Sequence, residues 1–343
     1  MLLEGTILAG RLFDPVQGRV VVEDGHIQDI EEGEARSSNI ILPAFVNAHT
    51  HLGDSIAKGA GEGLSLEELV APPNGLKHQL LSQATNERKR TAMSNSLALM
   101  ERTGTAAFIE FREGGVPGVE LINDVLDRVP LKGRILGRGT VEAIEASDGF
   151  GASAASDGEF TSERTATGDA DKLFGIHAGE VDSSDINPAL DLEPNFLVHM
   201  VHPDPLHLER IEDSETPVVV CPRSNASTGV GLPPVSSLLD RTTVALGTDN
   251  VMLNSPSMFR EMAFTERVTD VSSREVLSMA THYGADIAGF NCGCIEEGRD
   301  AALLILDGES PNLAGVTDPV RAVVRRASVD DVSEVIYPWN SSS

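Results

Sequence analysis

The chain of 343 residues has few cysteines, few lysines and no long hydrophobic run. Its cysteines, Cys221, Cys292 and Cys294, are odd in number and include no C-x-x-C pair. This argues against a disulfide framework and a cysteine zinc site, so we expect reduced packing residues. No apolar run approaches the roughly 18 residues of a membrane span, and Glu4 and Arg11 interrupt the apolar N-terminus where a signal peptide needs continuity. We therefore expect a cytoplasmic protein without membrane partners.

Lysine is scarce within a strongly acidic composition. Asp and Glu total 53 against 26 Lys and Arg, a formal net charge of -27. Such a field repels nucleic acids and anionic membranes and keeps a protein soluble. An acidic surface poor in lysine also suits a salt-rich cytoplasm, where ions screen the self-repulsion. We therefore treat halophilic adaptation as a hypothesis, with an ordinary acidic protein as its alternative.

Short apolar runs alternate with helix-compatible stretches from about residue 105 onward, which is typical of a parallel sheet covered by helices. The expected strands are 105–111, 133–139, 149–155, 173–179, 195–201, 217–222 and 243–249. With 40–49 added, eight strands predict an α/β protein with a (β/α)8 TIM-like barrel. The helix signals include 66–70, 86–102, 118–128 and 273–284.

The two ends of the chain have a different pattern. Short alternating segments with turn residues such as Asp24 and Gly25 predict antiparallel strands. We expect residues 1–40 and 295–343 to pair into one small β domain, and residues 41–294 to form the barrel.

Polar residues recur where the expected barrel strands end, and active sites of such barrels lie at the carboxyl ends of the strands. Arranged by strand, these residues are His49 and His51, His177 and Glu180, His199 and His202, Asn225, and Asp249. All of them should therefore face the same mouth.

A metal site is the main interpretation of this arrangement. Alternation along a strand puts His49 and His51 on one side, and His177 and Asp249 would complete a His₃Asp set with a position left for water. This set suits one divalent ion, zinc first and iron(II) second, which lowers the pKa of bound water to about 7. Alone, a His-x-His pair is more often two ordinary polar residues. The combination of four residues at strand ends favours the metal site.

The order of motifs resembles the amidohydrolase superfamily, in particular its aminohydrolase branch. That branch includes cytosine, guanine and S-adenosylhomocysteine deaminases and the triazine chlorohydrolases. The matching segments are "LPAFVNAHTHLGDS", "GIHAGE", "LVHMVH", "CPRSN", "GVGLPPV", "VALGTDN", "SMFREM" and "EEGRDAALLILD". They follow the family order over nearly the whole chain.

The resemblance implies the barrel, the β domain and one metal ion on His49, His51, His177 and Asp249. It also implies that Glu180 protonates a ring nitrogen of the substrate, while His199 and Asp249 handle the proton of the attacking water. A carboxylic acid beside a developing ring anion agrees with this role. From the residues alone, His199 or His202 could each be the catalytic histidine of this strand, because a spacing of three puts them on different sides if the strand continues. The resemblance favours His199, and we expect His202 to cap the strand or to lie at the pocket rim, where it could contact the substrate.

The implied function is a metal-dependent hydrolytic deaminase. Metal hydroxide would attack the amino-bearing carbon of a purine, pyrimidine, pterin or related heterocycle and release ammonia. One alternative keeps the site and changes the bond, as in a cyclic amide hydrolase such as imidazolonepropionase or a triazine-type chlorohydrolase. Another is a catalytically dead barrel acting as a binding protein, although every expected ligand is present. The expected partner is a small heterocycle, and a homo-oligomer is compatible with the sequence.

Three further charged residues near strand ends have two interpretations each. Glu110 and Arg112, in "FIEFREGG", should point to the same side, either to hold a polar heterocycle or as a structural ion pair. Arg223, in "CPRSN", could bind an anionic or carbonyl substituent or pair with an acidic rim.

Lys77 and His78 follow the first barrel strand in "APPNGLKHQLL". They could belong to a lid over the pocket, or to a solvated helix that starts after Pro72 and Pro73.

Overall fold

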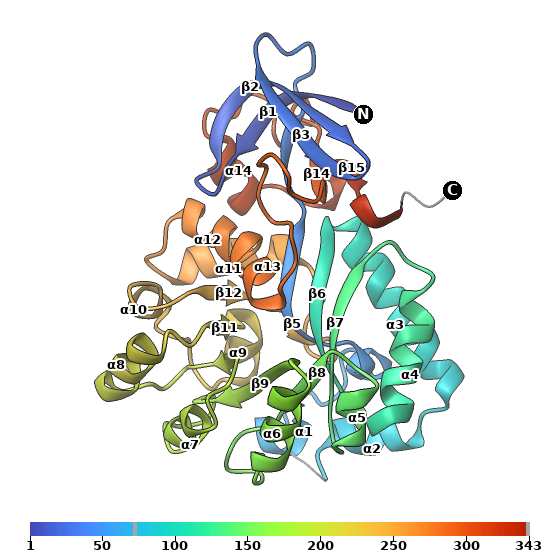
Figure 1. Ribbon diagram of the computed structural model, residues 1–343, viewed down its shortest axis with the longest axis vertical. Coiled ribbons are helices and arrows are strands. Elements are labelled where there is room, and N and C mark those ends of the chain that lie inside the picture. The colour runs from blue at the N-terminus through green and yellow to red at the C-terminus, as the bar shows by residue number, and fades with distance from the viewer. Residues whose placement is uncertain (71–73, 341–343) are drawn as a thin grey trace.

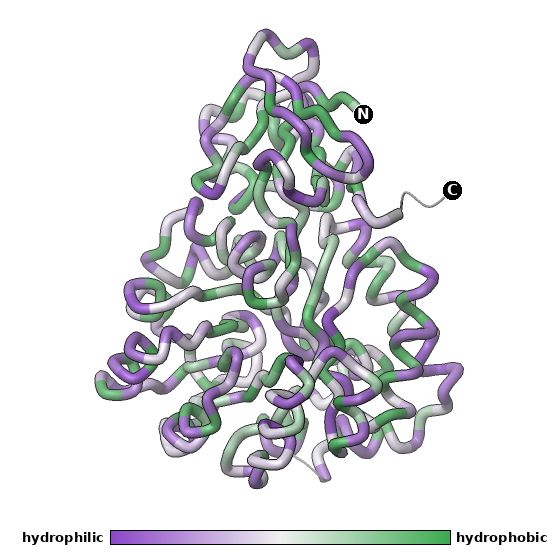
Figure 2. Tube along the Cα trace, viewed as in Figure 1, coloured by the Kyte–Doolittle hydropathy of each residue, from purple (hydrophilic) through white to green (hydrophobic). Residues whose placement is uncertain are grey.

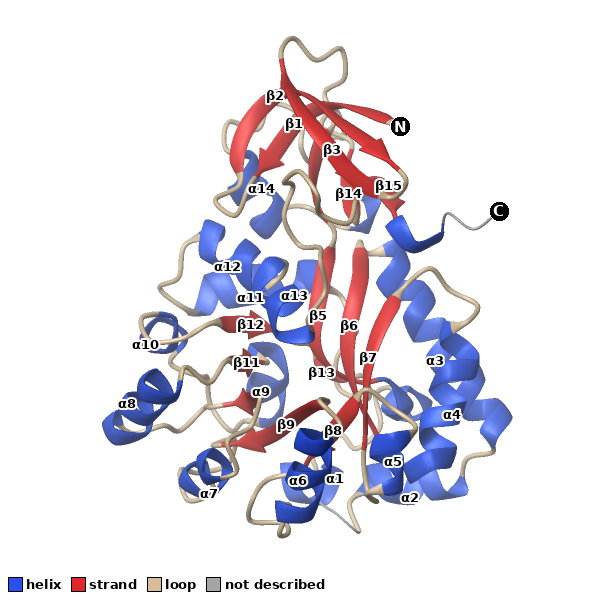
Figure 3. Cartoon of the chain, viewed as in Figure 1, coloured by secondary structure: helices blue, strands red, loops and turns tan. Residues whose placement is uncertain are grey.

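The computed structural model describes residues 1–70 and 74–340, and its strands form two separate sheets. Pro72 and Pro73, the expected helix start, lie outside the described residues. Figure 1 shows the smaller sheet at one end of the molecule, beside both termini. Figure 3 shows the strands of the larger sheet surrounded by helices. In the described part of the chain, no helix is long and apolar enough to cross a membrane.

The smaller sheet takes strands from both ends of the chain. In spatial order these are β15 (Val332–Ile336), β14 (Leu303–Leu306), β4 (Ile40–Pro43), β1 (Leu2–Ala9), β2 (Asp14–Glu23) and β3 (His26–Glu32). The strands β1, β2 and β3 give the sheet an apolar face that buries Ile7, Val20 and Ile27, one from each strand. Because β14 pairs with β4, the two chain ends share one sheet, as expected.

The larger sheet contains parallel strand pairs throughout its nine segments. In chain order they are β5 (Phe45–His51), β6 (Thr105–Arg112), β7 (Lys132–Gly137), β8 (Gly149–Ala152), β9 (Leu173–Ala178), β10 (Phe196–His199), β11 (Val218–Val220), β12 (Val244–Leu246) and β13 (Asp249–Asn250). Every residue of β5 and β6 is buried, as expected for parallel strands covered on both faces. The prediction of a (β/α)8 barrel is confirmed.

The eighth barrel strand is divided into β12 and β13, and this division closes the barrel. β12 pairs with β11, whereas β13 pairs with β5. Between them, Gly247 N donates to Val220 O, and Thr248 N donates to Asn47 Oδ1. A side chain at Gly247 would lie 2.7 Å from Cβ of His49, so only glycine allows this approach. One strand therefore joins the seventh strand to the first.

The strand expected over residues 40–49 is also divided, because its hydrogen-bond partners change. Ala44 N donates to Ala302 O beside the smaller sheet, and Phe45 N donates to Gly104 O beside the barrel. β4 therefore belongs to one sheet and β5 to the other. The change of partners could not be predicted from the sequence, because residues 40–46 form one continuous apolar run.

The helices cover the barrel from outside. They are α1 (Leu66–Val70), α2 (Leu76–Gln83), α3 (Asn86–Arg102), α4 (Gly115–Leu126), α5 (Glu142–Glu145), α6 (Thr161–Asp169), α7 (Ile186–Asp191), α8 (Pro205–Ser214), α9 (Pro222–Thr228), α10 (Val235–Leu239), α11 (Met258–Val268), α12 (Ser273–Met279), α13 (His282–Ala288) and α14 (Pro319–Arg325), with the 3-10 turns η1 (Leu52–Ala57), η2 (Val329–Asp331) and η3 (Pro338–Asn340). Figure 2 shows hydrophilic and hydrophobic stretches alternating along α3 and α4, as in helices with one buried face. The prediction of one helix over 273–284 is wrong, because the structure has two helices there. Thr281 leaves helical geometry and separates α12 from α13.

Candidate active site

His49 and His51 lie on the same side of β5 and face the carboxylate of Asp249. Their ring centroids are 4.9 Å apart, and their Nε2 atoms lie 3.3 and 3.6 Å from Asp249 Oδ1. The chain places the carboxylate there because β13 pairs with β5, with Asp249 opposite Thr50. His49, His51 and Asp249 are all buried.

Asp249 adopts a backbone conformation that is uncommon for residues other than glycine. Its φ is 55°, in the left-handed region, and such strain is concentrated at functional sites. Ser224 Oγ donates to Asp249 Oδ2. Oδ2 is therefore held by the protein, while Oδ1 stays directed at the two histidines.

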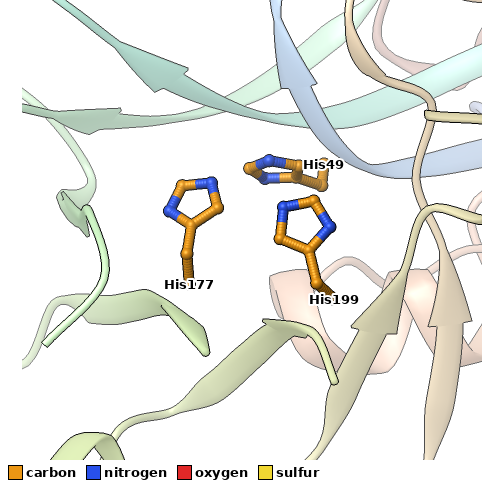
Figure 4. A group of neighbouring side chains, drawn as sticks. All are labelled: His49, His177 and His199. Atoms are coloured by element: carbon orange, nitrogen blue, oxygen red, sulfur yellow. The ribbon is translucent and has the colours of Figure 1, made fainter. Parts of the chain in front are cut away.

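His177 brings a third imidazole to the same place from the end of β9. Its ring centroid lies 5.0 Å from that of His49 and 5.3 Å from that of His199. Figure 4 shows the rings of His49, His177 and His199 gathered around one space, each from a different strand. The ligand atoms of these three residues lie within 4.8 Å of one another, and so do those of His49, His51 and Asp249. Both groups share His49.

The far nitrogens of two of these rings are held by the protein. Nδ1 of His51 lies 3.1 Å from Glu113 Oε1, and Nδ1 of His177 lies 2.7 Å from the carbonyl oxygen of Ala152. A metal-binding histidine usually donates its other N–H in this way, which fixes its orientation. Neither ring nitrogen of His49 makes a hydrogen bond with any residue that the structure describes. A buried imidazole that makes no hydrogen bond to a described residue and has the Asp249 carboxylate near its Nε2, beside two oriented rings, fits a metal site.

The ionisation states also suit cation binding. Burial lowers the pKa of His49, lowers that of His51 to about 3, and lowers that of His177 well below its usual range. Burial opposes ionisation of Asp249, but the adjacent His49 and His199 hold its pKa well below the usual range. Neutral imidazoles and an ionised carboxylate are the forms that bind metal ions.

Glu180 and His199 form the other wall of the space. Glu180 Oε2 lies 3.5 Å from His199 Nε2. Asn225 Nδ2 donates to Glu180 Oε1 at 3.4 Å and lies 3.1 Å from His199 Nδ1. Burial raises the pKa of Glu180, which favours its protonated form. His199 has a φ of 82°, another left-handed residue at this site.

The family model for the amidohydrolase family matches residues 40–195 and 193–335. The chain belongs to the amidohydrolase family. A relative from Methanothermobacter thermautotrophicus, provisionally named an aminohydrolase, is 35% identical over 97% of this chain and 96% of its own length. The 5-methylthioadenosine/S-adenosylhomocysteine deaminase of Halobacterium salinarum is 27% identical over 87% of this chain and 80% of its own.

A solved structure has the same fold as this amidohydrolase. The zinc-bound adenosine deaminase from Xanthomonas campestris superposes with a TM-score of 0.80 at 18% identity, covering 98% of this chain and 91% of that one. The family resemblance inferred from the motifs is confirmed, and so is the assignment as a hydrolase of C–N bonds.

Glu110 and Arg112 of this amidohydrolase lie in the protein interior. Glu110 accepts hydrogen bonds from Thr50 Oγ1 at 2.7 Å and Leu52 N at 2.8 Å, and its Oε1 lies 3.3 Å from Arg112 Nη1. Its side chain is 0% exposed and that of Arg112 is 3% exposed. Of the two interpretations, the structural ion pair fits this placement.

Arg223 and His202 are the other two candidates for substrate contact that the sequence offered. Arg223 Nε lies 2.6 Å from Oε2 of buried Glu261, and its Nη2 donates to the carbonyl oxygen of Ser255. This placement fits pairing with an acidic residue, although the partner is buried within α11. His202 is exposed beyond β10, as expected for a residue at the strand end or rim.

Two residues near the site, Glu113 and Lys77, make contacts that the sequence did not predict. Glu113 stands directly beside His51, and Lys77 is buried against Glu113 rather than solvated. The concentration of charge in "FIEFREGG" was the available signal for Glu113. The burial of Lys77 had none, since it depends on how the segment after β5 folds back.

Proposed function

We propose that the protein is a metal-dependent deaminase that hydrolyses an exocyclic amino group from a nitrogen heterocycle such as a purine, pyrimidine or pterin. The observation that carries this proposal is the meeting of Glu180, His199 and Asp249, whose side-chain atoms lie within 4.8 Å of one another beside the histidine cluster. This arrangement offers a proton donor and a proton acceptor at one point. Deamination needs both.

One divalent ion would be held by His49, His51, His177 and Asp249. Three nitrogens and one oxygen suit zinc, with iron(II) as the alternative. When bound, the ion supplies a water ligand with its pKa lowered to about 7. The absence of a hydrogen bond from any described residue to either ring nitrogen of His49 and the oriented rings of His51 and His177 support this assignment.

Asp249 and His199 act on the attacking water. Asp249 is ionised, so it can accept the proton that the water loses when it attacks the amino-bearing carbon. His199 is held by Asn225 and presents Nε2 to the same space, where it orients the water. Asp249 then returns the proton to the departing amino group, which leaves as ammonia, and the remaining hydroxyl proton passes to Glu180 as the carbonyl forms.

Glu180 acts on the ring nitrogen next to that carbon. Attack on the carbon places negative charge on this nitrogen, and a neutral carboxylic acid can neutralise it by donating a proton. Because burial raises the pKa of Glu180, its protonated form persists closer to neutral pH than that of an exposed glutamate. A cyclic amide hydrolase or triazine chlorohydrolase gives this acid a less direct role, which favours deamination.

The names of the relatives determine which substrates to test first. A halobacterial relative is named a 5-methylthioadenosine/S-adenosylhomocysteine deaminase, and a structural neighbour is an adenosine deaminase. We therefore place purine nucleosides and their thioethers ahead of free bases and pterins.

The test is ammonia release by the zinc-loaded protein from a panel of amino-purines, amino-pyrimidines and pterins at several salt concentrations. We expect release from at least one group, loss of release after chelation, and recovery when zinc is returned. A loaded protein that releases no ammonia but opens a cyclic amide or liberates chloride would falsify deamination. A protein without stoichiometric metal would support the binding-protein alternative.

A further inference from the structure

A second group of buried charges lies beside His51, on the side away from Asp249. It consists of Asp54 in η1, Lys77 in α2 and Glu113 after β6, and these three define the Lys77 cluster. The side chain of Lys77 is 5% exposed and that of Asp54 is 0% exposed. Lysine is almost never buried to this degree unless it is paired.

One oxygen of Glu113 receives three donors. Oε1 lies 2.6 Å from Lys77 Nζ, 3.1 Å from His51 Nδ1 and 3.2 Å from Arg138 Nη1. The carboxylate therefore accepts the Nδ1 proton of His51, which leaves the lone pair of Nε2 directed at the metal space. The position of Glu113 thus determines the tautomer and orientation of a proposed ligand.

Lys77 supplies the positive charge that this arrangement requires. His51, Asp54 and Glu113 have ligand atoms within 4.8 Å of one another, a spacing able to hold a cation. The cation present is the ammonium group of Lys77, which also lies 3.0 Å from Asp54 Oδ2. Without it, Asp54 would lose its ion-pair partner. Among the described residues, Glu113 would keep only the guanidinium groups of Arg138 and Arg112 as charged partners. The two buried carboxylates would then repel each other, and Glu113 would be held less firmly against His51.

We propose that Lys77 is a positioning residue for the metal site, acting through Glu113 on His51. The inference rests on the proposed function in one respect, that His51 binds the ion. Because Lys77 belongs to α2, it also links that helix to the proposed metal ligand His51 through Glu113. A role limited to anchoring α2 would leave metal affinity unchanged.

The test is zinc affinity, measured on the full-length protein by competition with a chromogenic chelator. The variants are Lys77→Met, which keeps the length of the side chain without its charge, Glu113→Gln, and Lys77→Arg. Lys89→Met, on α3 away from Glu113, is the control. Thermal unfolding of the metal-free forms measures any purely structural effect.

We expect Lys77→Met and Glu113→Gln to weaken zinc binding by about 10- to 100-fold, as the loss of an outer partner of a metal ligand usually does. The zinc affinity of Lys77→Arg should be closer to that of the unmodified protein than the affinity of Lys77→Met is. The zinc affinity of Lys89→Met should equal that of the unmodified protein. If Lys77→Met does not fold, the zinc affinity of Glu113→Gln tests the inference instead. Unchanged affinity in the folded variants overturns this inference alone, whereas an unmodified protein without metal overturns the proposed function too.

Discussion

Oε2 of Glu180 and Nε2 of His199 lie 3.5 Å apart, although the two residues follow different barrel strands. Asn225 contacts both side chains from α9 and so keeps the acid and the imidazole facing each other. The pair borders the space lined by His49 and His177. This placement is what the proposed function requires of an acid that protonates a heterocycle beside the proposed metal ligands.

Replacing Glu180 by Gln keeps the size of the side chain and removes its proton donor. We expect kcat for ammonia release to fall by about 10²- to 10⁴-fold, the usual contribution of a general acid, while zinc content stays the same. Steady-state kinetics and metal analysis check this. Glu209→Gln, an exposed position on α8, is the matched control. Unreduced kcat in Glu180→Gln would remove Glu180 from the reaction.

The ion pair of Arg223 and Glu261 should be structural. Arg223→Met removes the charged partner of buried Glu261 and leaves its carboxylate, among the described donors, only the backbone N–H of residue 223, and we expect a loss of about 3 to 5 kcal/mol in the free energy of unfolding. Adding Glu261→Leu should restore most of that stability, because the uncompensated charge is gone. Denaturant unfolding of both variants measures this. Full stability but a raised KM in Arg223→Met would instead support a substrate contact.

His282 should make the protein less stable in acid. It packs against Phe13 and Tyr283, and burial lowers its pKa to about 4. Since the unfolded chain takes up its proton near pH 6.5, the contribution of neutral His282 is present above that pH. It is lost as the pH falls toward 4, by about 3 kcal/mol.

His282→Asn should therefore show a shallower loss of stability between pH 6.5 and 4 than the unmodified protein. Denaturant unfolding at a series of pH values measures the two slopes. His26→Asn, at a half-exposed position, controls for the loss of a histidine. Parallel slopes for His282→Asn and the unmodified protein would contradict the assignment.

The net charge of -27 should make folding depend on salt. We expect the unfolding temperature to rise between dilute buffer and molar KCl, because ions screen repulsion among exposed carboxylates. An uncharged osmolyte at the same osmolality is the control, because it is excluded from the protein surface but does not screen charges. Cooperative unfolding at the same temperature in dilute buffer and molar salt would indicate an ordinary acidic protein.

Strand-end residues could be placed from the sequence because two simple regularities act together. Alternation puts His49 and His51 on one side of a strand, and parallel strands bring their carboxyl ends to one face, where His177 and Asp249 lie. The family motifs then suggested roles for each. The fold class followed from the same alternation of strands and helices.

Ion-pair partners could not be predicted in the same way. Lys77 meets Glu113, and Arg223 meets Glu261, through the folding of connections whose course no periodicity determines. The buried hydrogen bonds of Glu110 could not be predicted for a similar reason. Its Oε2 accepts from Thr50 Oγ1 and from Leu52 N, which the chain brings there only as it turns after β5. The division of the eighth strand was also missed, because its second part is only two residues long.

That divided strand makes the seam of the barrel part of the proposed metal site. The segment that joins the last strand to the first ends in Asp249, the carboxylate that faces His49 and His51. A partly folded chain with an open seam would hold the histidines but lack their shared oxygen. Metal would then bind tightly only to the closed ring and so stabilise it selectively. In this protein, completing the fold and completing the site are the same event.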